Sequence, residues 1–245
     1  MDAFYGLYYR GIIKLFYEAG ILCPASIFKL KMKKKYTHIL WDFNGTIYND
    51  VDASRQATNV LLEERNLKPI ETIRQLREGF CFPVKDYYSS LGFDYSLESY
   101  EDIAIKWTKL YNDFSKLSTS VDGVGDVITK LNVLGYTQSI ISACENDLLH
   151  TKLFELGFDG LFAEVEGTGD SNAHSKMQIA LEWKRCNPSS TALFIGDTPH
   201  DFEVATAINA DCILYSGGFV SEARLISCGC PVIGSFEELW SYIEQ

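Results

Sequence analysis

The stretch His38-Ile39-Leu40-Trp41-Asp42-Phe43-Asn44-Gly45-Thr46 decides the fold of this chain. It begins as a short apolar run and then changes abruptly to an acidic residue, an amide, a glycine and a hydroxyl. In a parallel α/β sheet, a strand that ends this way brings its polar residues to the carboxyl edge, where such sheets bind ligands. Gly45 permits a sharp turn, and Thr46 adds a hydroxyl beside backbone N–H groups. A simple turn after a strand shows the same pattern, so the remaining motifs must separate the two interpretations.

Length and composition limit the class of protein. The chain has 245 residues, 47% of them hydrophobic, which suits one large domain or a domain with an inserted lid. A net charge of -11 disfavours a nucleic-acid or anionic-membrane partner. An acidic protein that handles phosphate needs a local cation, and a divalent metal is the obvious candidate.

The cysteines predict a reduced protein in the cytoplasm. They are odd in number and scattered along the chain, and Cys228 and Cys230 are too close in sequence for an ordinary disulfide or zinc pair. Most are expected to be small buried hydrophobes in a reducing compartment.

Residues 1–31 differ in character from the rest and are interpreted as an N-terminal extension. The segment is aromatic and apolar, but its longest uncharged run, from Ala19 to Phe28, is too short to span a membrane. A signal peptide is disfavoured because Asp2 stands where a basic start is usual. Two interpretations of the segment stay open: a non-native leader, or an amphipathic helix that lies at a membrane interface or forms a dimer. We assign the extension no catalytic role.

A helical insertion follows the first strand. After Ile47 the alternation of strands and helices stops, and apolar residues recur at helical spacing in several runs up to about Thr119. We therefore expect a cap at residues 50–119, inserted into a core made of residues 32–49 and 120–245. A small helical bundle behind a strand-end site can close over a substrate and exclude water.

The chain then returns to strand–helix alternation. Residues 135–142 predict a second strand that ends in Ser142, followed by a helix near 146–156. The Ser142 hydroxyl can bind a phosphoryl oxygen or cap the helix after it. Lys176 begins a later helix and would be a fixed cation at the same edge of the sheet.

A third strand, Ala192 to Ile195, is expected to deliver Asp197 to this edge, with Asp201 in the first turn of the next helix. Together with Asp42 these carboxylates would form an oxygen-rich pocket of the kind that Mg²⁺ prefers. Asp201 can cap its helix at the same time. Further strands are expected near 212–215 and 231–233, and a terminal helix from Phe236.

The ordered set of motifs resembles a known family. Asp42-x-Asn44-Gly45-Thr46, Ser142, Lys176 and Gly196-Asp197-x-x-x-Asp201 are similar to the four motifs of the haloacid dehalogenase superfamily. The resemblance runs from about Tyr36 to the end, and the insertion resembles the helical cap of the phosphoglycolate phosphatase and β-phosphoglucomutase branch. It implies an α/β fold: a Rossmann-like parallel sheet with an inserted α-helical cap.

The resemblance also implies roles for these residues. Asp42 matches the nucleophile that forms an aspartyl-phosphate, which water hydrolyses. The implied Mg²⁺ ligands are Asp42, the backbone carbonyl of Asn44, Asp197 and Asp201. The implied phosphate-binding residues are Thr46, Ser142 and Lys176, and Lys176 also offsets transferred charge.

One residue departs from the family pattern. Phosphatases of the family usually carry a second Asp where this chain has Asn44, and that Asp gives a proton to the leaving oxygen. An amide cannot do so, although general acid–base help contributes about 10²–10⁴-fold in rate. The enzyme would then act on good leaving groups such as acyl or aryl phosphates, borrow a proton donor from the cap or from His200, or bind phosphate with little catalysis.

These motifs predict a Mg²⁺-dependent phosphatase that acts on a small phosphorylated metabolite. One alternative is a catalytically weak phosphate-binding or regulatory protein. Another is an enzyme similar to phosphonoacetaldehyde hydrolase, which would use a cap lysine such as Lys85 to form a Schiff base. A mutase and a dehalogenase fit less well, because the first depends on the missing acid–base residue and the second needs no metal. Substrate identity and oligomeric state are left open by these residues.

Overall fold

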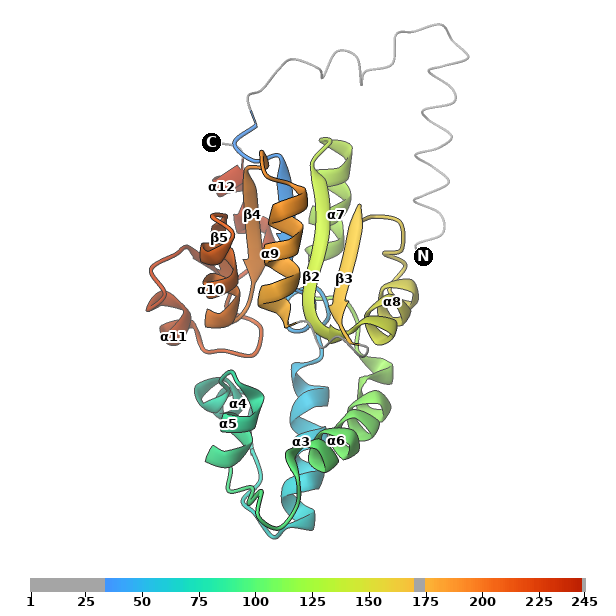
Figure 1. Ribbon diagram of the computed structural model, residues 1–245, viewed down its shortest axis with the longest axis vertical. Coiled ribbons are helices and arrows are strands. Elements are labelled where there is room, and N and C mark those ends of the chain that lie inside the picture. Colours follow the sequence, from blue (N-terminus) through green and yellow to red (C-terminus); the bar gives the residue numbers. More distant parts are fainter. Residues whose placement is uncertain (1–33, 170–174, 244–245) are drawn as a thin grey trace, which may run out of the picture. The chain divides into compact units, whose positions relative to one another are not determined.

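Six parallel strands form the centre of the structure, a computed structural model that describes residues 34–169 and 175–243 (Figure 1). The spatial order is β3-β2-β1-β4-β5-β6, and every neighbouring pair runs parallel. The strands are β1 (His38–Trp41), β2 (Thr137–Glu145), β3 (Glu164–Thr168), β4 (Ala192–Gly196), β5 (Asp211–Tyr215) and β6 (Val232–Ile233). The extension predicted at residues 1–31 lies outside the described residues.

The strand register aligns β1 with its neighbours β2 and β4 near the carboxyl ends of β1 and β4. Trp41 at the end of β1 lies opposite Ile140 of β2 and Ile195 of β4. Asp42 follows Trp41 directly, and Asp197 follows Gly196, the last residue of β4, so both leave the sheet at its carboxyl edge.

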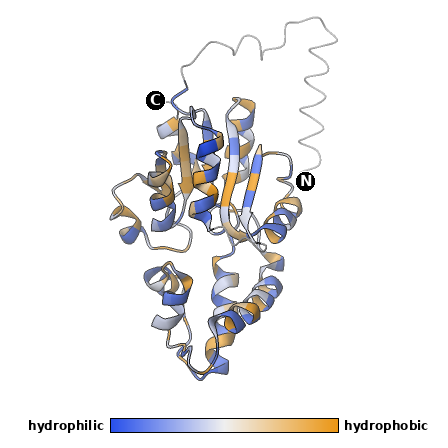
Figure 2. Ribbon diagram, viewed as in Figure 1, coloured by the Kyte–Doolittle hydropathy of each residue, from blue (hydrophilic) through white to orange (hydrophobic). Residues whose placement is uncertain are grey.

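Helices cover both faces of the sheet. The core-forming helices are α7 (Val124–Val133), α8 (Asn146–Glu155), α9 (Lys176–Cys186), α10 (Pro199–Ala207), α11 (Glu222–Ile226), η2 (Phe236–Leu239) and α12 (Trp240–Ile243). Alternate residues of β1 divide the core: Ile39 and Trp41 pack with α7 and α8, whereas Leu40 packs with α9 and α10. Figure 2 shows the matching pattern, with hydrophobic residues on the central strands and hydrophilic ones on the outer side of α9.

The segment between β1 and β2 is helical and extends beyond the carboxyl ends of the strands (Figure 1). It contains α3 (Val51–Glu64), α4 (Ile73–Gly79), α5 (Val84–Ser90), α6 (Tyr100–Phe114) and η1 (Ser115–Leu117). The two linkers pair with each other, since the Asn49 N–H donates to the Thr119 carbonyl and the Val121 N–H to the Ile47 carbonyl, both at 2.9 Å. The prediction of a parallel sheet with a helical insertion is confirmed.

Strand β3 was absent from the expected elements. It is an edge strand of sequence Glu-Val-Glu-Gly-Thr that is nowhere fully buried, so it lacks the apolar run that marked the other strands. Strand β2 is also longer than expected and continues past Ser142 to Glu145, with a register shift between Ile141 and Glu145 where it pairs with β3. Among the described residues, no helix is long and apolar enough to cross a membrane.

Candidate active site

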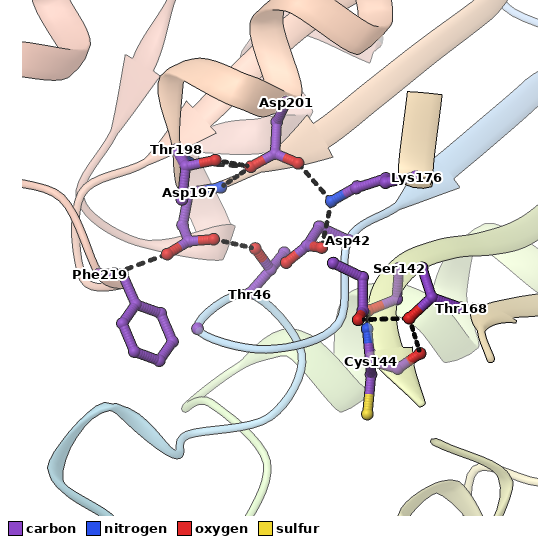
Figure 3. Close-up of polar contacts among 12 residues, drawn as sticks. Asp42, Thr46, Ser142, Cys144, Thr168, Lys176, Asp197, Thr198, Asp201 and Phe219 are labelled. Carbon is purple, nitrogen blue, oxygen red and sulfur yellow. Dashed lines mark hydrogen bonds and ion pairs between the residues drawn. The ribbon is translucent and has the colours of Figure 1, made fainter. Parts of the chain in front are cut away.

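Three buried carboxylates meet at the carboxyl edge of the sheet (Figure 3). Asp42 follows β1, Asp197 follows β4, and Asp201 lies in the first turn of α10. Each offers one oxygen that lies within 4.8 Å of the others. The structure therefore brings together the three acidic side chains that the sequence analysis had predicted at this edge of the sheet, two at strand ends and Asp201 in the helix that follows.

Lys176 supplies the positive charge of this group. Its ammonium, which is buried, donates to Asp42 Oδ1 and to Asp201 Oδ1, the latter at 2.5 Å. Lys176 is the first residue of α9, and a capping box made by Ser175 and Gln178 fixes the start of that helix. The helix cap thus fixes the backbone position from which the Lys176 side chain reaches the carboxylates.

The ionisation of the group reflects burial and crowding. Burial raises the pKa of Asp42 to about 7 despite the Lys176 ammonium. Burial and the neighbouring Asp42 and Asp201 raise the pKa of Asp197 well above its usual range. Burial opposes the charged forms of Asp201 and Lys176 too, but their ion pair outweighs it, so the pKa of Asp201 is lowered and that of Lys176 raised. The carboxylates are held together against their mutual repulsion.

The donor set fits a divalent cation. With all three carboxylates ionised and Lys176 protonated, the group carries two surplus negative charges in a buried place. Such a surplus is costly unless a cation balances it. Carboxylate oxygens are the ligands that Mg²⁺ prefers. Asp42, Asp197 and Asp201 would hold the ion, and the Asn44 carbonyl as a further ligand stays a prediction.

Backbone groups fix the orientation of Asp197 and Asp201. Asp201 Oδ2 accepts from the N–H groups of Asp197 and Thr198, at 3.1 and 2.9 Å, so the side chain caps α10 while its other oxygen faces Lys176. Asp197 accepts from the Phe219 N–H at 2.6 Å and from the Thr46 hydroxyl at 3.3 Å. The Thr46 hydroxyl is thus directed to Asp197, and its predicted contact with phosphate stays a prediction.

Glycine is required where the loop of residues 42–46 passes Asp197. Gly45 has φ +76°, and a Cβ there would come within 2.5 Å of Asp197 Oδ2. The Gly217-Gly218-Phe219 loop after β5 also packs on Asp197. Sequence reasoning missed this loop, although a glycine pair directly after a strand at the same sheet edge was a usable signal.

Ser142 lies on the other side of Asp42. Its buried hydroxyl oxygen accepts from the Cys144 N–H at 3.0 Å, which leaves the hydroxyl proton for another acceptor. Thr168 of β3 stands beside it and donates to the Ala143 carbonyl at 2.7 Å (Figure 3). Ser142 is therefore oriented by its own loop, and its phosphate-binding role stays a prediction.

The side chain of Asn44 takes part in a buried cluster that the sequence did not predict. Its amide donates to Asp50 Oδ2 at 2.7 Å and to the Tyr111 hydroxyl at 3.0 Å. The Tyr111 hydroxyl donates to Asp50 Oδ2 at 2.6 Å, and the Gly45 N–H donates to Asp50 Oδ1 at 2.9 Å. Burial raises the pKa of Asp50 to about 6, and these donors limit the rise. The cluster joins the loop of residues 42–46 to the start of α3 and to α6 of the insertion.

Removing the Tyr111 hydroxyl tests this cluster. We expect Tyr111→Phe to lower the free energy of unfolding by about 2 kcal/mol at about pH 8, since Asp50 loses a hydrogen bond to a charged acceptor. Asp50 takes up a proton in the folded state as the pH falls through about 6. The loss should therefore shrink to about 1 kcal/mol at about pH 5, where the bond joins neutral groups. Urea denaturation at both pH values measures the difference.

Tyr95→Phe is the matched control for this prediction. Its hydroxyl also belongs to the insertion and donates to the Lys85 carbonyl at 2.6 Å, but that bond is exposed. We expect a change of less than about 0.5 kcal/mol at either pH. A loss in Tyr111→Phe that is the same at both pH values would contradict an ionised Asp50 as its acceptor.

A cavity of about 370 Å³ opens above the carboxylates and reaches under the insertion. Asp42, Ser142 and Lys176 line its base, and aromatic side chains of α5, α6 and the α4–α5 loop line part of the cap side, together with small polar residues such as Ser54, Thr58 and Thr108. This volume is in the range of small-ligand sites.

Three other side chains of this region, Lys85, Arg77 and His200, differ in their position relative to the cavity. Lys85 lies over the rings of Tyr95 and Tyr100 and is not among the described residues that line the cavity. Arg77 donates to the carbonyls of Gly217 and Gly218, the latter at 2.7 Å. His200 does line the cavity, with Nδ1 3.1 Å from Glu203 Oε2. No observation favours a Schiff base at Lys85.

Comparison with known families gives one match. The model of the haloacid dehalogenase-like hydrolase family matches residues 39–215, which include Asp42, Ser142, Lys176, Asp197 and Asp201. No curated protein matches the sequence significantly.

Solved structures share the fold at low identity. A predicted phosphatase from Clostridium acetobutylicum is 19% identical, with a TM-score of 0.67 over 84% of this chain and 97% of that one. A predicted phosphoglycolate phosphatase from Haemophilus somnus is 16% identical, with a TM-score of 0.66 over 86% and 99%. A HAD family hydrolase from Deinococcus radiodurans with bound phosphate and sodium is 17% identical, with a TM-score of 0.65 over 85% and 95%. At these identities the likeness concerns the fold.

Proposed function

This chain belongs to the haloacid dehalogenase-like hydrolase family, and from that premise we propose that it is a Mg²⁺-dependent phosphatase of a small phosphorylated metabolite. The observation that carries the proposal is the buried group of Asp42, Asp197, Asp201 and Lys176 at the base of a cavity. Residues 50–119 serve as the cap over this site, and the cytoplasm is the expected compartment.

Asp42 acts as the nucleophile in this proposal. One of its oxygens attacks the phosphorus atom, the bond from phosphorus to the leaving oxygen breaks, and an aspartyl-phosphate forms. Water then attacks the same phosphorus atom and releases phosphate and the Asp42 carboxylate. Lys176, which donates to Asp42 Oδ1, orients the nucleophile and balances negative charge on the phosphoryl group. Ser142 lines the same base of the cavity and has a hydroxyl proton to donate to a phosphoryl oxygen.

The metal supplies charge neutralisation and orientation of the phosphoryl oxygens when it is bound. The chain contributes the preformed carboxylate set, and the hydrogen bonds from Phe219 and Thr198 hold two of its members in place. The cap shields the site from bulk water, which strengthens these electrostatic interactions.

Magnesium is expected to act on stability as well as on turnover. At about 100 times its dissociation constant, Mg²⁺ should stabilise the protein by about 2.7 kcal/mol, because it binds the folded state alone. The shift in thermal midpoint and the release of phosphate from phenyl phosphate should both disappear with excess EDTA and in Asp197→Asn. Asp126→Asn, an exposed change on α7, is the control that should retain both.

The outcomes separate the functions under consideration. Magnesium-dependent turnover supports the phosphatase. A magnesium-dependent stability shift without turnover of any phosphate ester would instead favour the phosphate-binding alternative. A stability shift that survives in Asp197→Asn would refute the proposed metal site.

A further inference from the structure

The cavity above the carboxylates is aromatic on the cap side. Aromatic residues that line it on this side include Phe80, Phe82, Tyr87, Tyr88, Tyr100 and Trp107. Several of these rings are fixed by contacts with other rings: Phe80 packs on Phe219 at a centroid distance of 5.0 Å, and Trp107 stacks on Tyr111 at 4.7 Å. Fixed rings around a volume of about 370 Å³ suit a flat apolar group.

The same cavity offers little to a second anion. Lys176 is the only lysine or arginine among the described residues that line it, and its ammonium is already shared by Asp42 and Asp201. Arg77 is turned to the carbonyls of Gly217 and Gly218. His200, on the core side of the cavity, has Nδ1 3.1 Å from Glu203 Oε2. A carboxylate or second phosphate on the cap side would therefore be buried without a lysine or arginine to pair with it, which is costly.

Position 44 supplies no proton to the leaving oxygen. The Asn44 amide is committed to Asp50 and Tyr111, and both oxygens of Asp50 already accept hydrogen bonds. A phenol, with a pKa of about 10, leaves as its anion far more readily than an alkyl alcohol, whose pKa lies near that of water at about 16. The chemistry of position 44 and the shape of the cavity thus point to the same kind of leaving group.

Resting on the proposed function, we propose that the substrate is an aryl phosphate monoester whose aromatic group carries no second anionic group. Asp42 attacks phosphorus, and the electron pair of the breaking bond leaves on the phenolate oxygen. Water then attacks the phosphoryl group, its oxygen stays on the released phosphate, and Asp42 departs as a carboxylate. The attacking water releases one proton to solvent and the phenolate takes up one proton from solvent, so the reaction involves no net change in protons.

Three esters of similar size test the proposal on the full-length protein with Mg²⁺: phenyl phosphate, cyclohexyl phosphate and 4-carboxyphenyl phosphate. We expect kcat/KM for phenyl phosphate to exceed that for cyclohexyl phosphate by at least about 100-fold. The added carboxylate should lower kcat/KM at least about 10-fold, although its phenol is no poorer a leaving group. Phosphoglycolate, an alkyl phosphate with a carboxylate, should be the poorest substrate.

A pair of variants tests the aromatic wall. Phe82 is 41% exposed and lines the cavity, so Phe82→Ala removes a wall with little loss of core packing. We expect KM for phenyl phosphate to rise about 5-fold with kcat little changed. Phe154→Ala, which truncates a 72% exposed ring on α8, should leave KM unchanged.

The results distinguish this inference from the proposed function. Equal turnover of phenyl and cyclohexyl phosphates, lost in Asp42→Asn, would overturn the aryl preference and leave the phosphatase in place. Faster turnover of the carboxylated ester would overturn the exclusion of a second anion. No turnover of any of the four esters would overturn both proposals.

Discussion

Replacing Asp42 by asparagine is expected to lower kcat/KM for phenyl phosphate by about 10⁴-fold or more, the scale seen when a nucleophile is removed. The amide is nearly isosteric with the carboxylate but cannot form the aspartyl-phosphate. The measurement is release of phosphate with saturating Mg²⁺, together with acid-quench trapping of a phosphorylated protein. The parent should trap label on Asp42, and the variant should trap none.

The variant is expected to fold. Burial raises the pKa of Asp42 to about 7, so a neutral amide relieves a desolvation cost that the carboxylate imposes. Lys176 keeps Asp201 as a partner at 2.5 Å. Asp126→Asn, an exposed change of the same chemistry, should keep full activity. Residual turnover above about 1% in a folded Asp42→Asn would show that Asp42 is not the nucleophile.

The main features of the fold could be predicted from the sequence because they depend on short, strong signals. Strands β1 and β4 are buried apolar runs that end in polar residues, and the helical insertion shows apolar residues at helical spacing. Strand β3 could not be predicted this way, because an edge strand with exposed glutamates carries no such run. Its place in the sheet is decided by pairing with β2.

The polar groups at strand ends could likewise be predicted, because parallel strands bring their carboxyl ends to one edge. Asp42, Asp197 and Lys176 meet there as expected. The Asn44 cluster could not be foreseen. Tyr111 is 67 residues from Asn44, and in the sequence it looks like one more apolar position of a helix. Asp50 precedes α3 as a helix cap would, but its side chain makes no capping bond and turns to Gly45, Asn44 and Tyr111 instead.

In this cluster the Asn44 amide and the Asp50 carboxylate are hydrogen-bonded to each other. Exchanging the two residues would place a carboxyl group at position 44, and we expect the double variant to hydrolyse alkyl phosphates. In Asn44→Asp alone, two carboxylate oxygens would meet where the Asn44 amide now lies 2.7 Å from Asp50. Like charges so close must share a proton, and that proton is held between them instead of facing the leaving oxygen. In the double variant Asn44→Asp with Asp50→Asn, the amide nitrogen at 50 donates to the carboxylate at 44, and the Gly45 N–H keeps the oxygen at 50 as its acceptor. The Tyr111 hydroxyl, which now donates to Asp50 Oδ2, would donate to the new carboxylate at 44 instead.

We therefore expect the double variant to raise kcat/KM for cyclohexyl phosphate by about 10²-fold or more, the lower range of general acid catalysis. Asn44→Asp alone should gain clearly less, and Asp50→Asn alone, which leaves two amides, should gain nothing. Turnover of phenyl phosphate should change less than about 10-fold in all three, because a phenolate leaves without a proton. The parent needs mass spectrometry first, since deamidation at Asn44-Gly45 would mimic the single variant. Equal gains in single and double variants would show that Asp50 does not constrain position 44, whereas no gain in the double variant would show that proton donation does not limit the reaction.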